Sequence, residues 1–248
     1  MRTPSLPGLA ALAAALLTAP AAAQEASQPR LILSIGAGAH TGHGLWSVTG
    51  PPVVGVDSLR MSRSIGSGLM ATFSATYFPG GHVGFYGDIT FLDMEMDNNC
   101  TPAPYCGELD GSTSGNSSLL FGGGITLRAA PGGSQSPYAR LGVGYARHAH
   151  GTVGVDAIFP GSPPVQLIAD ESPMGGSPAL LLAAGLSQSI GTGYQLRLEV
   201  RDDFFALERV TSAPNALGQV TTDTGWYHHL SLTIGFDIVF DRTRARRY

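Results

Sequence analysis

The chain has 248 residues and a formal net charge of −4, and only 13% of its residues are charged, about half the roughly 25% of soluble globular domains. Hydrophobic residues make up 43%, which excludes a disordered chain, and no excess of basic residues points to nucleic acid. All 14 basic residues are arginine, and the 34 glycines are about twice the usual share of roughly 7%.

Residues 1–23 have the pattern of a secretory signal peptide. Arg2 supplies the positive charge, residues 9–17 form a short apolar stretch, and Ala21, Ala22 and Ala23 are the small residues that precede a cleavage site. We expect cleavage before Gln24. A retained membrane anchor is the alternative, but its apolar stretch is well short of the roughly 20 residues that span a bilayer. The sequence therefore predicts an exported protein, with residues 24–240 as its folded domain and residues 241–248 as an Arg-rich periplasmic tail.

Eight segments of the mature chain alternate apolar and small or polar residues with period two. No stretch after the leader approaches 18 continuous apolar residues, so a transmembrane helix is not expected. Each segment is long enough, or nearly so, to cross a membrane as a tilted strand of about 9–11 residues. The segments are 31–40, 65–77, 83–91, 118–128, 138–145, 180–190, 194–201 and 229–240.

The connections between these segments alternate in length. Short ones are expected at residues 79–81, 129–136 and 191–193, and long polar or Pro-rich ones at about 48–63, 94–116, 150–176 and 207–225. Tight turns at one end and long loops at the other are typical of membrane barrels. The prediction is an all-β fold, an eight-stranded antiparallel up-and-down transmembrane β-barrel with both termini at the periplasmic end.

Aromatic residues cluster near the predicted strand ends, as in the two girdles of membrane barrels. A soluble barrel or sandwich is the alternative, but the polar face is mostly Gly, Ser, Thr and Ala, too small for a solvated exterior. The expected girdle residues are Tyr77, Phe78, Tyr138, Tyr194 and Phe240 at the short-turn end, and Phe91, Phe204, Phe205, Trp226 and Tyr227 at the other.

The leader, the charged row Arg197-Leu198-Glu199-Val200-Arg201 and the final strand at residues 229–240 together resemble one known group. These features are similar to the small eight-stranded outer-membrane barrels, namely the OmpA membrane domain, OmpX and the opacity-type surface proteins. The resemblance implies location in the outer membrane and contact with the barrel-assembly machinery. Such barrels often end at the aromatic residue of the last strand, whereas this chain continues to Tyr248, so either Phe240 or Tyr248 could serve that machinery.

The polar parity of the predicted strands directs four arginines and four acids into the lumen. Buried charges are costly unless they are paired, so this balanced set predicts a hydrogen-bonded network that closes the lumen, with Arg197 opposite Asp237. An ion or solute path is the alternative. The eight residues are Asp88, Arg128, Arg140, Arg197, Glu199, Arg201, Asp203 and Asp237.

Three smaller features bear on chemistry. Cys100 and Cys106, the only cysteines, are expected to form a local disulfide in an exported chain. His229 and Ser231 have the spacing of the His and Ser of outer-membrane lipid A deacylases, but both have inward parity, so we expect no catalysis. His40, His43, His148 and His150 are expected as solvated histidines at the outer rim rather than as metal ligands.

The sequence thus predicts a non-enzymatic outer-membrane protein with a structural or surface-interaction role through four long extracellular loops. A small porin-like channel and a lipid-modifying enzyme are the alternatives. No catalytic or metal-binding residue and no cofactor is expected. The expected partners are outer-membrane lipids, lipopolysaccharide and the assembly machinery, with no nucleic acid; the loop partner is not specified, and the protein is expected to be a monomer.

Overall fold

The computed structural model describes residues 30–50, 60–101, 113–148, 152–157, 165–171, 175–212 and 221–241. The predicted leader and the residues after 241 lie outside these ranges. In chain order the strands are β1 Arg30–His40, β2 Gly44–Thr49, β3 Arg60–Ile65, β4 Gly68–Phe78, β5 Val83–Thr101, β6 Thr113–Arg128, β7 Gln135–His148, β8 Thr152–Ala157, β9 Val165–Glu171, β10 Ser177–Gly191, β11 Tyr194–Val210 and β12 Thr222–Asp241.

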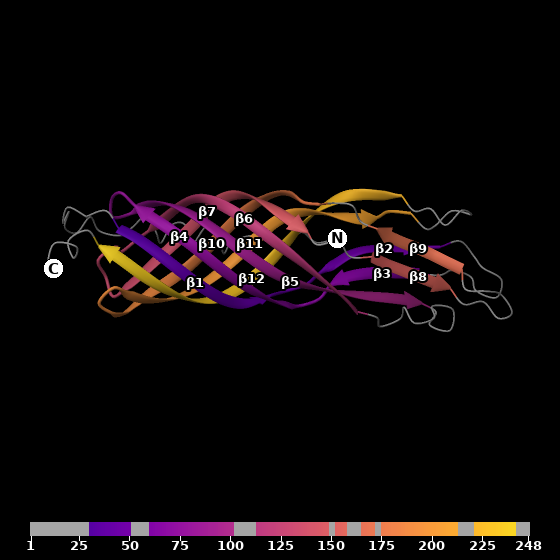
Figure 1. The fold of residues 1–248 in the computed structure, drawn as a ribbon, viewed down its shortest axis with the longest axis horizontal. Helices are drawn as coiled ribbons and strands as arrows, with labels where there is room; N and C mark the ends of the chain where they lie inside the picture. Colours follow the sequence, from indigo (N-terminus) through magenta and orange to yellow (C-terminus); the bar gives the residue numbers. More distant parts are fainter. Residues whose placement is uncertain are drawn as a thin grey trace, which may run out of the picture.

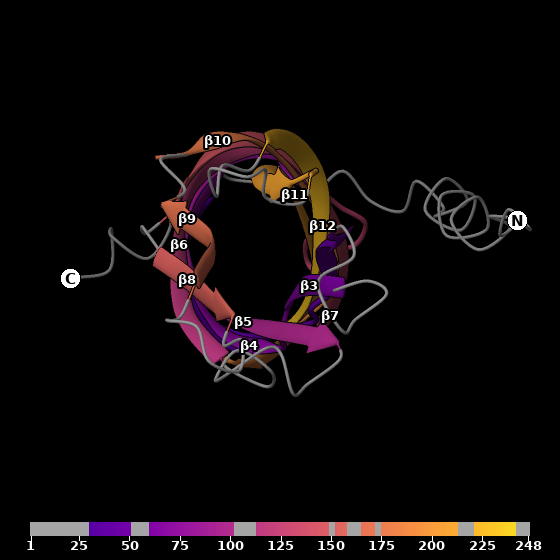
Figure 2. The same cartoon turned by 90° about the vertical axis from the view of Figure 1, so that its right-hand side faces the viewer.

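Eight of these strands close into a ring of antiparallel neighbours. The order around the ring is β1, β4, β5, β6, β7, β10, β11 and β12, and β12 pairs again with β1. Figure 2 looks from one end of the molecule and shows the strands surrounding a central axis. The architecture is therefore an eight-stranded antiparallel up-and-down β-barrel, as the sequence predicts. No helix in the described part of the chain is long and apolar enough to cross a membrane.

Period-two alternation gives this barrel an apolar exterior. All eight ring strands expose large apolar side chains, among them Ile35, Phe73, Phe85, Val143 and Ile234. Inward positions on the same strands are small or polar over most of their length, because eight strands leave an interior just wide enough for side chains. An exterior of this kind matches the hydrocarbon of a bilayer.

Several strands run further toward the long-loop end than their sequence patterns predict. β5 and β6 extend into the region predicted as the 94–116 loop, and β11 and β12 extend into 207–225. The end of β2 and most of β3 fall within the loop predicted at 48–63, where β2 pairs with β3 and β3 pairs with the end of β5. The strands β8 and β9 form a separate hairpin within the 150–176 region. Figure 1 shows these additions at the end of the barrel opposite the C-terminus.

The alternation of polarity inverts where β5 leaves the apolar belt. Above the exposed Phe91, the inward residues are Leu92 and Met94, and the outward residues are Asp93 and Glu95. Such a strand has water rather than lipid outside it and an apolar core inside. This upper part of the barrel is accordingly a water-facing β-structure that continues the membrane-embedded part.

The predicted aromatic girdles are correct in part. Tyr77, Tyr194, Phe240, Phe91 and Trp226 are exposed on the outer surface. By contrast, the inward-facing Phe78, Tyr138 and Phe205 are buried in the barrel. Position near a strand end does not distinguish exposed from buried rings, because odd and even positions of a strand point to opposite faces of the sheet.

Candidate functional site

The barrel interior is the first candidate site, since the structure places all eight of the predicted lumen residues there. Each has an exposed fraction of 9% or less. They divide into two groups that we call the lower and upper charge clusters, with Arg128 nearer the short-turn end. The lower charge cluster is Arg140, Arg197, Glu199 and Asp237, and the upper charge cluster is Asp88, Arg201 and Asp203.

Glu199 is the centre of the lower charge cluster. Its Oε2 atom lies 3.3 Å from Nη1 of Arg140 and 3.7 Å from Nη1 of Arg197, and it accepts a hydrogen bond of 2.7 Å from the Tyr138 hydroxyl. One carboxylate is thus shared by two guanidinium groups, an arrangement that suits the planar fork of arginine. The lower cluster connects three strands, β7, β11 and β12.

Arg197 and Asp237 are paired, but they are not opposite each other as predicted. Arg197 faces Gly235 across β12, and Asp237 faces Gln195. Nε of Arg197 lies 3.6 Å from Oδ1 of Asp237, so the pair spans a diagonal of the β11–β12 ladder. A long side chain reaches a diagonal neighbour on one face of a sheet, and Gly235 leaves the space that the guanidinium crosses.

The upper charge cluster lies two positions further along β11. Arg201 donates from Nε to Oδ1 of Asp203 at 2.7 Å, and from Nη1 to Asp88 on β5. Since β5 and β11 are not neighbours in the ring, this contact crosses the lumen. At the short-turn end Arg128 donates from Nε to the Gly81 carbonyl at 2.6 Å.

Above the charge clusters the lumen contains an apolar plug that the sequence analysis did not predict. It packs side chains from the ring strands against others from β2 and β3, with Trp46 and Tyr227 at its border. Apolar residues at alternate, inward-facing positions of one strand, such as Leu92, Met94 and Met96 of β5, are the sequence signal that could have revealed it. The plug consists of Leu45, Ile65, Met70, Leu92, Met94, Met96, Leu120, Ala146, Ala179, Leu181, Phe205 and Leu207.

The prediction that the rim histidines are solvated is wrong for His40 and His148. His40 is buried and its Nε2 lies 2.7 Å from the Asp93 carbonyl oxygen. His148 is buried with Nδ1 2.7 Å from the Ser118 hydroxyl. His43 stacks on Tyr227 with 5.2 Å between ring centroids. His150 lies outside the described residues.

The geometry around His229 does not form a catalytic pair. His229 is fully buried and stacks on Phe205 at 4.1 Å between centroids, and neither ring nitrogen has a hydrogen-bond partner within the described ranges. The Ser231 hydroxyl donates instead to the Arg201 carbonyl at 3.3 Å. Among the described residues no group of three or more His, Cys, Asp or Glu is placed to hold a metal ion.

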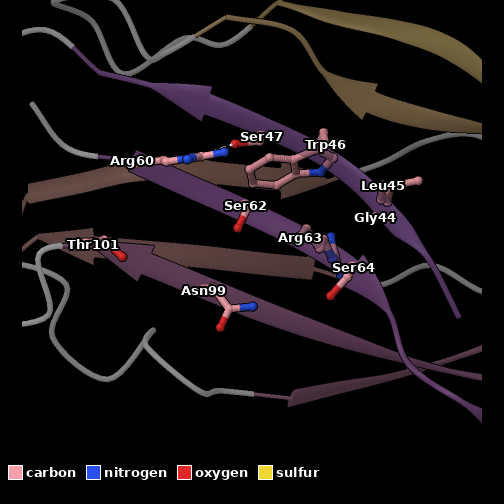
Figure 3. A pocket seen from close by; sticks show the side chains of 10 residues that line it. All are labelled: Gly44, Leu45, Trp46, Ser47, Arg60, Ser62, Arg63, Ser64, Asn99 and Thr101. Atoms are coloured by element: carbon pink, nitrogen blue, oxygen red, sulfur yellow. Dashed lines mark hydrogen bonds between the residues drawn. The ribbon is translucent and has the colours of Figure 1, made fainter. Parts of the chain in front are cut away.

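A second candidate site lies outside the barrel interior, on the β2–β3–β5 sheet. An open groove of about 560 Å³ is lined there by side chains from three adjacent strands (Figure 3). The cavity at the short-turn end of the lumen is far smaller, about 30 Å³, room for about two water molecules. The groove residues are Gly44, Leu45, Trp46, Ser47, Arg60, Ser62, Arg63, Ser64, Asn99 and Thr101.

Comparison with solved structures places this architecture among known proteins. The outer-membrane protein OprG of Pseudomonas aeruginosa superposes with a TM-score of 0.50 at 13% identity, over 87% of this chain and 97% of OprG. The fold is that of a small outer-membrane β-barrel. The neisserial surface protein NspA covers 85% of this chain and 97% of its own at 14% identity, with a TM-score of 0.44. No protein-family model and no curated protein sequence matches the chain.

Proposed function

We propose that the protein is a non-enzymatic integral outer-membrane protein that acts through its extracellular surface, on a barrel whose lumen stays closed. The observation that carries the proposal is the filling of the lumen: two ion-paired clusters lie below an apolar plug that includes Leu181 and Phe205. The structured part outside the belt, β2, β3 and the ends of β5, β11 and β12, is what such a barrel offers to partners.

The proposed location in the outer membrane is supported by three features. The exterior is apolar around the whole ring, the fold is shared with OprG, and residues 1–23 have the pattern of an export signal. Lipids and lipopolysaccharide would then surround the belt, and the assembly machinery would insert a monomer. The closer relationship to the OmpA membrane domain, OmpX and the opacity-type proteins is part of the same proposal.

Liposome swelling tests the closed lumen against the small-channel alternative. Protein reconstituted into liposomes is mixed with an isosmotic solution of a small sugar, and swelling is followed by light scattering. The expected rate equals that of empty liposomes, because the interior cavity found at the mouth holds only about two waters. Swelling that depends on the amount of folded protein would replace this proposal with a channel.

The absence of catalysis is tested on the lipid itself. Lipid A from cells with and without the protein is compared by mass spectrometry, and identical spectra are expected, since the ring of His229 is buried and stacks on Phe205. A mass difference that disappears in the His229→Gln variant would assign an enzymatic role.

The disulfide is a further part of the proposal. Cys100 is buried at the end of β5, while Cys106 lies outside the described residues. Alkylation of the denatured protein before reduction is expected to label neither cysteine, and labelling of both would contradict the bridge.

A further inference from the structure

The groove on the β2–β3–β5 sheet has the composition of a ligand site. Its volume of about 560 Å³ falls within the roughly 300–1,000 Å³ of small-molecule sites. A register shift between Gly44 and Trp46 directs Leu45 into the apolar plug and leaves Trp46 half-buried at the groove. Bulges commonly re-aim a side chain in this way.

The lining of the groove combines positive charge with hydroxyl and amide groups. The exposed Arg60 supplies this charge, whereas Arg63, which also lines the groove, is buried, and no carboxylate lines it among the described residues. Nε of Arg60 donates to the Ser47 hydroxyl at 3.2 Å, which uses one of the five N–H donors of the guanidinium and orients the rest (Figure 3). Ser62, Asn99 and neighbouring hydroxyls supply further donors and acceptors beside the indole.

These groups fit an acidic saccharide. An exposed arginine recognises a carboxylate or sulfate through charge-assisted hydrogen bonds. Serine, threonine and asparagine side chains pair with sugar hydroxyls, and the amphipathic indole of Trp46 offers a face to a sugar ring. An apolar ligand would leave most of this lining without partners.

The height of the groove decides where the saccharide comes from. Asn99 is eight residues beyond Phe91, the last exposed aromatic residue of the belt on β5. Eight residues advance about 26 Å along a strand, or about 20 Å along the barrel axis after tilt. Lipid phosphates at the edge of the hydrocarbon lie below this level, so a phosphate head group does not fill the groove, and the occupant is a saccharide in the aqueous layer above them.

We propose that this groove binds an acidic oligosaccharide from the extracellular solution, with Arg60 pairing to its anionic group and Trp46 contacting its ring. The inference rests on the proposed surface role and names the chemistry of one partner.

Fluorescence titration tests the proposal on the full chain. Trp46 and Trp226 are the only tryptophans, so the Trp226→Phe variant carries Trp46 as a single reporter. The refolded barrel in neutral-lipid nanodiscs is titrated with oligogalacturonate and with dextran-sulfate oligosaccharides. The neutral counterparts are methyl-esterified oligogalacturonate and dextran of equal length.

We expect at least one of the two acidic probes to bind. Its neutral counterpart should bind about tenfold more weakly or not at all. Arg60→Gln should lower the affinity by about tenfold or more, the scale of one hydrogen bond to a charged group. Arg209→Gln is the matched control, because Arg209 is also exposed on the extracellular part, where it pairs with Asp223 at 3.1 Å, and it should change the affinity less than twofold.

Three outcomes would overturn the inference: no binding of either acidic probe, equal binding of the neutral probes, or equal losses in the Arg60 and Arg209 variants, which would mean unspecific attraction. Competition by nanodiscs containing phosphatidylglycerol would assign the groove to lipid headgroups instead. Liposome swelling is independent of all these results, so failure here is distinguishable from failure of the closed-lumen proposal.

Discussion

Tyr138 on β7 donates a 2.7 Å hydrogen bond to Glu199 on β11, although β10 lies between the two strands. Gly185 of β10 is the register partner of both residues. The bond therefore passes over a position that has no side chain. A Cβ atom at Gly185 would lie 2.4 Å from the Leu198 carbonyl oxygen and 2.5 Å from the Tyr138 hydroxyl oxygen, so a larger residue does not fit beneath the bond.

Substitution of this glycine should accordingly weaken the lower charge cluster. We expect Gly185→Ala to lower the free energy of unfolding by about 1–3 kcal/mol, the usual cost of overpacking, in urea titrations of the barrel in lipid vesicles. Gly87→Ala is the matched control, because the nearest atom to a Cβ there is 3.8 Å away. Equal effects of the two substitutions would show that strand propensity, and not the lack of space at Gly185, explains the loss.

Removal of the Glu199 carboxylate should lower the free energy of unfolding more than Gly185→Ala does. Glu199→Leu leaves two guanidinium groups, those of Arg140 and Arg197, without the carboxylate they share. Breaking a buried pair typically costs ~3–5 kcal/mol, and a loss of this size is expected in the same unfolding measurement. Leu198→Ile, on the adjacent lipid-facing position with 49% exposure, should cost under about 1.5 kcal/mol. Comparable losses would argue against a stabilising network.

The orientation of the barrel predicts which end is accessible from outside the cell. Thr49 at the end of β2 and Thr192 in the β10–β11 turn are both exposed but lie at opposite ends. In intact cells a membrane-impermeant maleimide is expected to label Thr49→Cys and to leave Thr192→Cys unlabelled until the outer membrane is opened. The reverse pattern would invert the topology and remove the groove from the extracellular side.

Periodicity predicted the ring because each membrane-embedded strand has one lipid-facing side and one lumen-facing side. The same reasoning predicted strand ends too early, for a physical reason visible in β5. Beyond Phe91 the outer side faces water, so Asp93 and Glu95 take outward positions and Met94 takes an inward one. Within the barrel belt an apolar residue marks the lipid side, and above it an apolar residue marks the core.

The position of the charged residues in the lumen was predictable from the sequence, because successive side chains of a strand point to opposite faces of the sheet. Which of these charges pair with each other was not predictable. The diagonal contact of Arg197 with Asp237 depends on the β11–β12 register, which sequence spacing left two residues in error. The groove beside Arg60 depends on β3 joining β5, a pairing that no periodic pattern in residues 48–63 indicated.

Planar-bilayer conductance tests the central claim, a lumen closed by ion pairs and the apolar plug, most directly. Wild-type protein inserted into a neutral bilayer in 1 M KCl is predicted to add no steady conductance. Replacement of Leu181 and Phe205 by alanine, which empties part of the plug, serves as the comparison. Stable, stepwise conductance of the wild-type protein, with an ion selectivity that changes in Glu199→Gln, would contradict the account and identify the lumen as a conducting path.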